Sequence, residues 1–204
     1  MKRFVYIFCG VWVLFLLSAC AGAGTRFPII FSYKGKVPSN FRTAPSQQKV
    51  VVFPLEDKRE DRKLIARRIH LFGQVDTFES PITPVGENIF ILLVASLRQR
   101  GWDARLASLR IKPKDITTDL VVTGTIQSVW AEAISHFGYT KIDAHFSLNV
   151  EIINPKTGVK ITSKIADQNN TKVVFFHPEL IRDILNELIS SGLNRIDLTN
   201  SQAP

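Results

Sequence analysis

A strict alternation of apolar and polar residues over positions 142–152 is the feature that most restricts the fold of this chain. Every second position is apolar, and the five positions between are polar; the apolar set is Ile142, Ala144, Phe146, Leu148, Val150 and Ile152. Successive side chains of a strand point to opposite faces of its sheet. The pattern therefore predicts a strand of an antiparallel sheet with one face in the core and one in water.

The flanking sequence supplies the other elements. Strands are expected at 49–55, 102–108, 119–133 and 159–165, the last one returning after a turn at 154–158 to form an antiparallel hairpin. Helices are expected from Pro84 to about 100 and from Pro178 to about 196. Thr83 is placed to cap the first helix, and Gly101 suits its C-terminal end.

This order, β-α-β-β-β-β-α, predicts an α+β domain in which two helices pack on one face of a mostly antiparallel sheet. We expect one domain over 49–198, preceded by a tether at 20–48 and followed by a polar tail at 199–204. Two alternatives remain open for the apolar residues at 27–31. They either form a short strand that pads the domain or lie near a lipid surface.

The N-terminus has the parts of an export signal. Lys2 and Arg3 precede an apolar run at 4–17, which is shorter than the roughly 20 residues that span a bilayer. The run ends in Leu17-Ser18-Ala19-Cys20, which resembles the lipobox of bacterial lipoproteins. The alternative is an ordinary secretory signal with an incidental cysteine.

The lipobox resemblance implies a specific modification and location. It implies cleavage between Ala19 and Cys20, a diacylglyceryl group on the Cys20 sulfur and an acyl chain, such as palmitate, on the new amine. Several chains would hold the protein on the membrane, whereas one chain binds only marginally. Because Ala21 stands where an inner-membrane retention signal places aspartate, the resemblance also implies the outer membrane, facing the periplasm.

The net charge and the cysteine content restrict the classes of partner and the covalent bonds that we expect. The formal charge of +8 falls to +6 once Lys2 and Arg3 leave with residues 1–19. Cys9 leaves as well, so a chain lipidated at Cys20 forms no disulfide. A basic balance in the envelope favours anionic lipid headgroups or an acidic protein partner over nucleic acid. Self-association stays open.

No catalytic or metal site is expected. The four histidines are scattered, and no cysteine completes a zinc site. Asp143, His145 and Ser147 share a strand face, but residues two apart lie about 6.6 to 6.8 Å from each other, too far for a nucleophile and its base. Apart from lipid on Cys20, we expect no cofactor.

The segment 58–72 is the best binding candidate, because its cations enclose four apolar residues. Arginine suits bidentate capture of carboxylate or phosphate. The alternative is a solvated basic loop. The candidate partner-binding residues are Lys58, Arg59, Arg62, Lys63, Arg67 and Arg68. Phe137 and Tyr139 suggest a second patch near a turn with Trp130, although core packing is favoured for Trp130.

Three short stretches resemble the YajG-like family of uncharacterised bacterial lipoproteins. They are residues 50–55 running into Asp57-Lys58-Arg59, the helix end Leu97-Arg98-Gln99-Arg100-Gly101-Trp102, and Asp119-Leu120-Val121-Val122-Thr123-Gly124. The resemblance implies a fold and an envelope location but no reaction. We therefore expect a non-enzymatic binding or assembly module that docks a protein partner or an anionic envelope component. The alternatives are a structural subunit of a secretion or transport complex and, less favoured, a hydrolase of envelope polymers.

Overall fold

The computed structural model describes residues 24–33, 48–81, 83–107 and 118–198. The expected signal, Cys20, most of the expected tether and the polar tail lie outside these residues. The elements in chain order are β1 (Arg26–Pro28), β2 (Lys49–Val52), β3 (Glu56–Asp57), β4 (Leu64–Ile69), β5 (Val75–Glu79), α2 (Val85–Gln99), β6 (Asp103–Leu106), β7 (Leu120–His136), β8 (Tyr139–Ile153), β9 (Lys160–Val173) and α3 (Glu179–Asn194).

One mixed sheet is built around the long strand β7. On one side β7 pairs antiparallel with β8, which pairs antiparallel with β9. On the other side β2, β3 and β4 follow one another along β7, each parallel to it. Strand β6 extends the sheet beyond β2, while β5 and then β1 extend it beyond β4. The long strands make the sheet largely antiparallel, so the predicted α+β class is confirmed.

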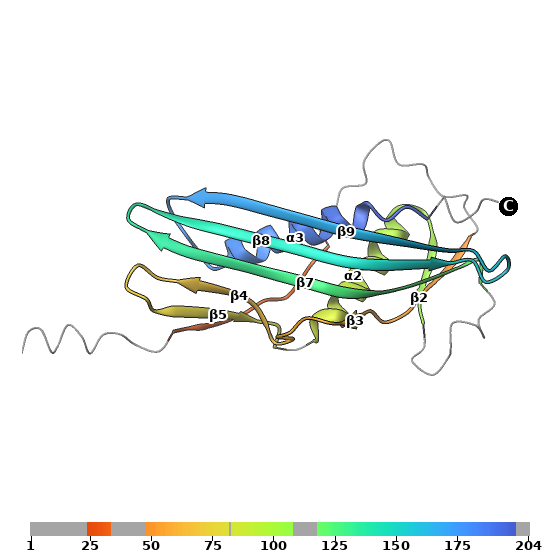
Figure 1. The fold of residues 1–204 in the computed structure, drawn as a ribbon, viewed down its shortest axis with the longest axis horizontal. Coiled ribbons are helices and arrows are strands. Elements are labelled where there is room, and N and C mark those ends of the chain that lie inside the picture. The colour runs from red at the N-terminus through yellow and green to blue at the C-terminus, as the bar shows by residue number, and fades with distance from the viewer. Residues whose placement is uncertain (1–23, 34–47, 82, 108–117, 199–204) are drawn as a thin grey trace, which may run out of the picture.

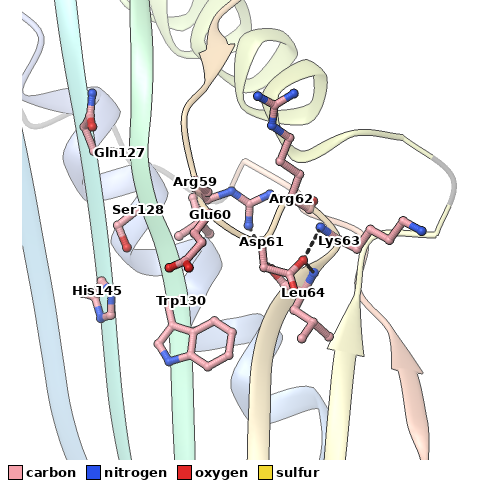
Figure 2. A pocket seen from close by; sticks show the side chains of 11 residues that line it. Arg59, Glu60, Asp61, Arg62, Lys63, Leu64, Gln127, Ser128, Trp130 and His145 are labelled. Atoms are coloured by element: carbon pink, nitrogen blue, oxygen red, sulfur yellow. Dashed lines mark hydrogen bonds between the residues drawn. The ribbon is translucent and has the colours of Figure 1, made fainter.

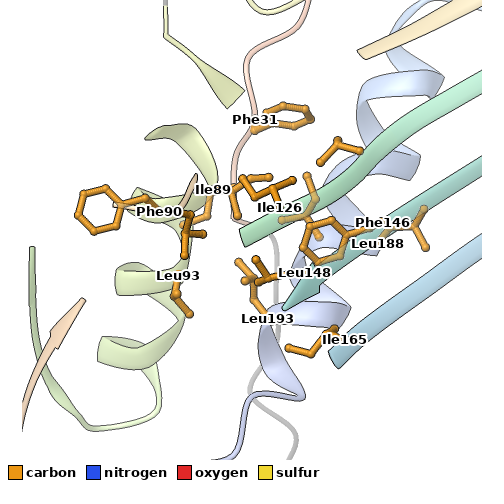
Figure 3. Packing of buried hydrophobic residues seen from close by; sticks show 14 of the residues in the cluster. Phe31, Ile89, Phe90, Leu93, Ile126, Phe146, Leu148, Ile165, Leu188 and Leu193 are labelled. Atoms are coloured by element: carbon orange, nitrogen blue, oxygen red, sulfur yellow. The ribbon is translucent and has the colours of Figure 1, made fainter. Parts of the chain in front are cut away.

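Helices α2 and α3 lie against the same face of this sheet (Figure 1). Figure 3 shows their apolar side chains meeting those of the sheet. The alternation in β8 is confirmed, since its six apolar residues are at most 3% exposed. Gly192 lets α3 approach closely, because a Cβ there would lie 2.6 Å from the Phe146 ring. The seven predicted elements are present in the predicted order.

The C-terminal cap predicted for α2 is confirmed, and its predicted N-terminal cap is not. Gly101 has a φ of +90°, and the N–H groups of Gly101 and Trp102 donate to Arg98 O and Leu97 O, as in a glycine-terminated helix. The expected cap by Thr83 is wrong. Pro84 occupies the cap position, so Thr83 lies one residue too early, and its carbonyl accepts bonds from Ser80 and Asn88 instead.

A β-bulge in β7 corrects the prediction for Trp130. The register with β8 shifts between Ile126 and Ser128, which adds one residue to β7. An extra residue exchanges the two faces of a strand. Even positions such as Ile126 are buried before the bulge, and odd positions such as Val129 are buried after it. Trp130 therefore lies half-buried on the face without helices rather than in the core.

The folded domain begins earlier than the predicted start at residue 49. Phe27 of β1 stacks on Phe78 with ring centroids 5.2 Å apart, and Ile29 and Phe31 are buried. The Ser32 N–H donates to Asn186 Oδ1 of α3 at 3.0 Å. Of the two alternatives left open for 27–31, the strand that pads the domain is the correct one.

The segment 56–80, expected to be a long polar connection, contains β3, β4 and β5. Two features hide β4 in the sequence. Adjacent residues Ile65 and Ala66 are both buried because the register with β5 shifts there, which breaks the alternation. Arg67 and Arg68 then lie on opposite faces, so a charged pair occupies the middle of a strand.

Candidate functional site

A buried ion pair organises the turn between β3 and β4. Arg59 is 7% exposed, and its guanidinium contacts the Asp57 carboxylate with an Nη2 to Oδ2 distance of 2.9 Å. The same guanidinium donates from Nη1 to Leu64 O at 3.0 Å and from Nη2 to Arg62 O at 2.8 Å. These bonds satisfy backbone carbonyls on the far side of the turn, so Arg59 holds residues 59–64 together.

Asp61 completes the turn from within. Its Oδ1 accepts the N–H groups of Lys63 at 2.9 Å and Leu64 at 3.0 Å. These two backbone bonds hold the pKa of the Asp61 carboxyl below its ordinary value. Arg62 and Lys63 stand exposed at the top of this fixed turn, and neither takes part in an ion pair among the described residues.

The turn faces the sheet across a hollow of about 870 Å³ on the face without helices (Figure 2). The floor is the bulged part of β7, with His145 of β8 beside it. This volume falls within the range of roughly 300–1,000 Å³ typical of ligand pockets. The lining residues are Arg59, Glu60, Asp61, Arg62, Lys63, Leu64, Gln127, Ser128, Val129, Trp130 and His145.

Trp130 gives the hollow an aromatic side. The Arg67 guanidinium lies 5.9 Å from the centre of the Trp130 ring, and Arg67 also pairs with Glu132 on β7. His145 lies on β8 along the same face, and partial burial lowers the pKa of its imidazole. His145 is thus mainly neutral near pH 7, so the charged groups that line the hollow are those of the turn, where Arg59, Arg62 and Lys63 lie beside Glu60 and Asp61.

A second hollow of about 380 Å³ continues along the same face of the sheet. Gln127 lines both hollows, so they are neighbours. Lys58 lines the second one, with its Nζ 3.4 Å from a carboxylate oxygen of Glu56. The other lining residues are Pro54, Thr123, Gly124, Thr125, Asn149, Glu151 and Thr162. Its side chains are mostly polar and of mixed charge, and unlike the first hollow it contains no aromatic side chain.

The six cations predicted as one binding set separate into three groups. Arg62 and Lys63 line the first hollow, with Arg67 at its edge. Lys58 belongs to the second hollow. The other two members, Arg59 and Arg68, have structural surroundings. Arg59 is buried in its turn, while Arg68 lies on the opposite face, donates to Ser135 and sits 4.1 Å from the centre of the Phe176 ring.

The side chains considered for chemistry do not converge. Asp143 accepts a hydrogen bond from Asn170 and pairs with Lys141 at 2.8 Å, so its bonds run along the sheet surface and not to His145. No group of three metal-binding side chains occurs among the described residues. The first hollow is lined by the Trp130 indole and by charged side chains of both signs, with the Glu60 carboxylate directed toward Ser128 and Trp130 and the Arg62 and Lys63 side chains extending away from the sheet (Figure 2).

Sequence reasoning missed two parts of this site. The contribution of Trp130 depends on the bulge, and that of His145 depends on the pairing of β7 with β8; neither has a local signal. It also missed the aromatic connection Phe175-Phe176-His177, whereas Phe72 falls at the end of the predicted segment 58–72, and Phe137 and Tyr139 were suggested as a second patch near a turn.

Comparisons with known proteins address the fold. No family model matches the chain, and no curated protein matches it. It is similar to a DUF330-family protein from Xanthomonas campestris, with 7% identity, a TM-score of 0.54, and coverage of 84% of this chain and 91% of that one. At this identity the similarity establishes a shared fold.

Two other solved structures are more distant. A homolog of neuraminyllactose-binding hemagglutinin from Helicobacter pylori has 14% identity and a TM-score of 0.47, with 85% of this chain and 94% of that one covered. A lipoprotein from Neisseria meningitidis has 9% identity and a TM-score of 0.37, with 71% and 97% covered. Separately, no helix within the described residues is long and apolar enough to cross a membrane.

Proposed function

We propose that this protein is an outer-membrane lipoprotein of the YajG-like group that faces the periplasm. The signal is cut between Ala19 and Cys20, and acyl chains on Cys20 hold the domain on the membrane. The tetrapeptide 17–20 after an apolar run supports this location. The structure described begins at Gly24, four residues after Cys20, so little chain separates the anchor from the domain.

On the membrane the protein acts as a binding or assembly module and not as an enzyme. The observation that carries this proposal is the exposed pair Arg62 and Lys63, which extends away from the sheet on a turn that the buried Asp57–Arg59 ion pair fixes beside the Trp130 hollow (Figure 2). A fixed turn loses little conformational entropy when it binds. The ligand class that fits is a carboxylate or phosphate group next to an apolar or flat surface, on a protein partner or an anionic envelope component.

A role as a subunit of a larger envelope complex is the second candidate. The observation in its favour is β9, a fourteen-residue strand at an edge of the described sheet. Its outward-facing side chains include Lys160, Lys164 and Lys172, and lysines on an edge strand discourage strand addition. The docking turn therefore ranks ahead of the edge.

The proposed anchor is tested by metabolic labelling with an alkyne analogue of palmitate. The full chain and Cys9→Ser should both be labelled and sediment with membranes. Cys20→Ser should lose the label and leave the membrane pellet. Equal labelling of Cys20→Ser and the unchanged chain would contradict lipidation at this site.

The proposed docking site is tested by charge reversal in the full-length protein. After chemical crosslinking in cells, Arg62→Glu with Lys63→Glu should reduce the partner that co-purifies by about tenfold or more, because opposite charge at a docking surface becomes repulsive. The matched control is Lys164→Glu, an exposed cation of β9 on the same face of the sheet. Equal losses in both variants would show that overall charge, and not this turn, governs binding.

A further inference from the structure

The most exposed large apolar side chains of the described residues gather in three connections. Phe72 is 96% exposed, Phe137 92%, Phe175 86% and its neighbour Val174 70%. Phe72 lies between β4 and β5, Phe137 between β7 and β8, and Phe175 between β9 and α3. A domain that hides nearly all its other aromatic rings gains nothing for its own core from these three.

Strand pairing brings the three connections to one end of the sheet. Ile69, the last residue of β4, pairs with Ile134, close to the β7–β8 turn at Phe137 and Gly138. Val173, the last residue of β9, pairs with Thr140, just after that turn. The three tips lie at the same end of the long axis in Figure 1. We call residues 70–74, 137–138 and 174–178 the aromatic end.

The aromatic end has the charge character of a membrane-facing surface. Its residues include no aspartate or glutamate, and the exposed Glu179 that follows it has a carboxylate oxygen 3.3 Å from His177 Nδ1. Lys172 lies beside it with its ammonium 5.3 Å from the centre of the Tyr139 ring, and the Arg26 side chain is 81% exposed nearby on β1. Aromatic rings and basic side chains are what proteins place at the boundary between headgroups and acyl chains.

The opposite end of the sheet has a different composition. The turn between β8 and β9 is Asn154-Pro155-Lys156-Thr157-Gly158, with no aromatic residue. Its residues from 155 onward are exposed, and the Asn154 side chain accepts the N–H groups of Lys156 and Thr157. Among the described residues the most exposed apolar side chains thus lie at the aromatic end, whereas Val159 beside the opposite turn is 38% exposed.

The chain enters the domain at the aromatic end. Arg26 pairs with Thr77 on β5, and the Thr77 N–H donates to Thr25 O at 2.9 Å, so Gly24 lies beside the start of β5. Cys20 precedes Gly24 by four residues, which span at most about 14 Å when fully extended. A lipid on Cys20 is therefore always within reach of these loops.

We propose that the aromatic end is a membrane-contacting surface, with Phe72, Phe137 and Phe175 inserted among the lipid headgroups of the bilayer that holds Cys20. This proposal rests on the lipid anchor proposed above. Lipid fits better than a protein partner because three rings on three separate tips lie at the end where a short anchor would fix the bilayer. Contact at this end directs the β8–β9 turn away from the membrane and leaves the Trp130 hollow on the side of the domain.

The test places a fluorescent reporter at the aromatic end of the full-length lipoprotein. Phe137→Cys is labelled with an environment-sensitive maleimide dye and reconstituted in vesicles of phosphatidylethanolamine and phosphatidylglycerol that contain spin-labelled quencher lipid. Thr157→Cys, exposed in the turn at the opposite end, is the matched control, and Phe72→Cys gives a second reporter in a separate loop.

The dyes at positions 137 and 72 should shift to shorter emission wavelengths and be quenched at least about twofold more strongly than the dye at 157. Equal emission and quenching at 137, 72 and 157, with one reactive thiol per chain, would overturn insertion while leaving the anchor intact. A dye at 137 that is shielded only when envelope proteins are added, without lipid quenching, would overturn it in favour of a protein partner. Two or more reactive thiols per chain would show that Cys20 is unmodified and overturn the anchor together with the insertion that depends on it.

Discussion

Arg59 and Arg62 lie three residues apart in one turn but have opposite surroundings. Arg59 is buried, paired with Asp57 and bonded to two backbone carbonyls, whereas Arg62 is exposed over the hollow. Because Arg59 is buried and hydrogen-bonded in this way, its role is to stabilise the turn. Because Arg62 is exposed next to such a fixed residue, we propose it as the residue that meets a ligand.

We therefore expect Arg59→Ala to lower the free energy of unfolding by about 3–5 kcal/mol, because it leaves the Asp57 carboxylate buried without its partner. Arg62→Ala should change it by less than about 0.5 kcal/mol. Urea unfolding followed by circular dichroism measures both. Similar losses for the two variants would contradict the division of roles.

Asp76 links the start of the domain to β4. Burial alone would raise the pKa of the Asp76 carboxyl, but the Thr25 N–H at 2.8 Å, His70 Nε2 at 2.6 Å and the positive charge of Arg68 together lower it below its ordinary value. A depressed pKa in the folded state stabilises the fold at pH values above the ordinary value of about 3.9. That stability is lost as the pH falls through the folded pKa.

Asp76→Asn should accordingly cost about 1–3 kcal/mol at pH 7, through the weakened bonds to Thr25 and His70. The difference in unfolding free energy between this variant and the unchanged chain should shrink below about pH 4. Urea titrations at a series of pH values measure it. A difference that stays constant down to pH 3 would show that ionisation of Asp76 contributes nothing.

At the scale of elements, the contact between α3 and β8 depends on the absence of a side chain at Gly192. Gly192→Ala should destabilise the protein by about 1–3 kcal/mol through its clash with Phe146, although alanine is the better helix former. Ser191→Ala, on the exposed side of the same helix turn, should be neutral or slightly stabilising. A stabilised Gly192→Ala variant would mean that helix and sheet are farther apart than described.

Elements with an unbroken local pattern were predictable from the sequence, and those defined by long-range pairing were not. Strand β8 shows its alternation over its whole length, and α2 and α3 show apolar stripes ended by recognisable residues. Strand β4 combines a register shift with two central arginines, and β1 and β3 are only three and two residues long. Such short strands exist because β5 and β7 offer them a partner.

The candidate site divides in the same way. Arg62 and Lys63 were identified from charge and residue type alone. The sequence did not show that Arg59 is buried and that Arg68 lies on the opposite face of the sheet. It also did not show that Trp130 points away from the core, which results from the bulge at 126–128. No residue type in the sequence predicts a bulge, so Trp130 was assigned to the wrong face of the sheet.

Across the whole molecule, the two faces of the sheet and one of its ends have different surroundings. The helices and the core cover one face, while the two hollows occupy the other. The aromatic end lies where the chain enters from the proposed anchor. With the proposed anchor in place, this arrangement would hold the proposed docking turn at a defined side of the membrane-attached domain.

Site-specific photocrosslinking in intact cells tests the docking surface most directly. A photoreactive residue in place of Arg62 should give a discrete adduct with an envelope partner, and the adduct should weaken by about tenfold when Lys63→Glu is added. The same residue in place of Lys164, on the same face of the sheet, should give none. No adduct at Arg62, or equal adducts at both positions, would contradict the account.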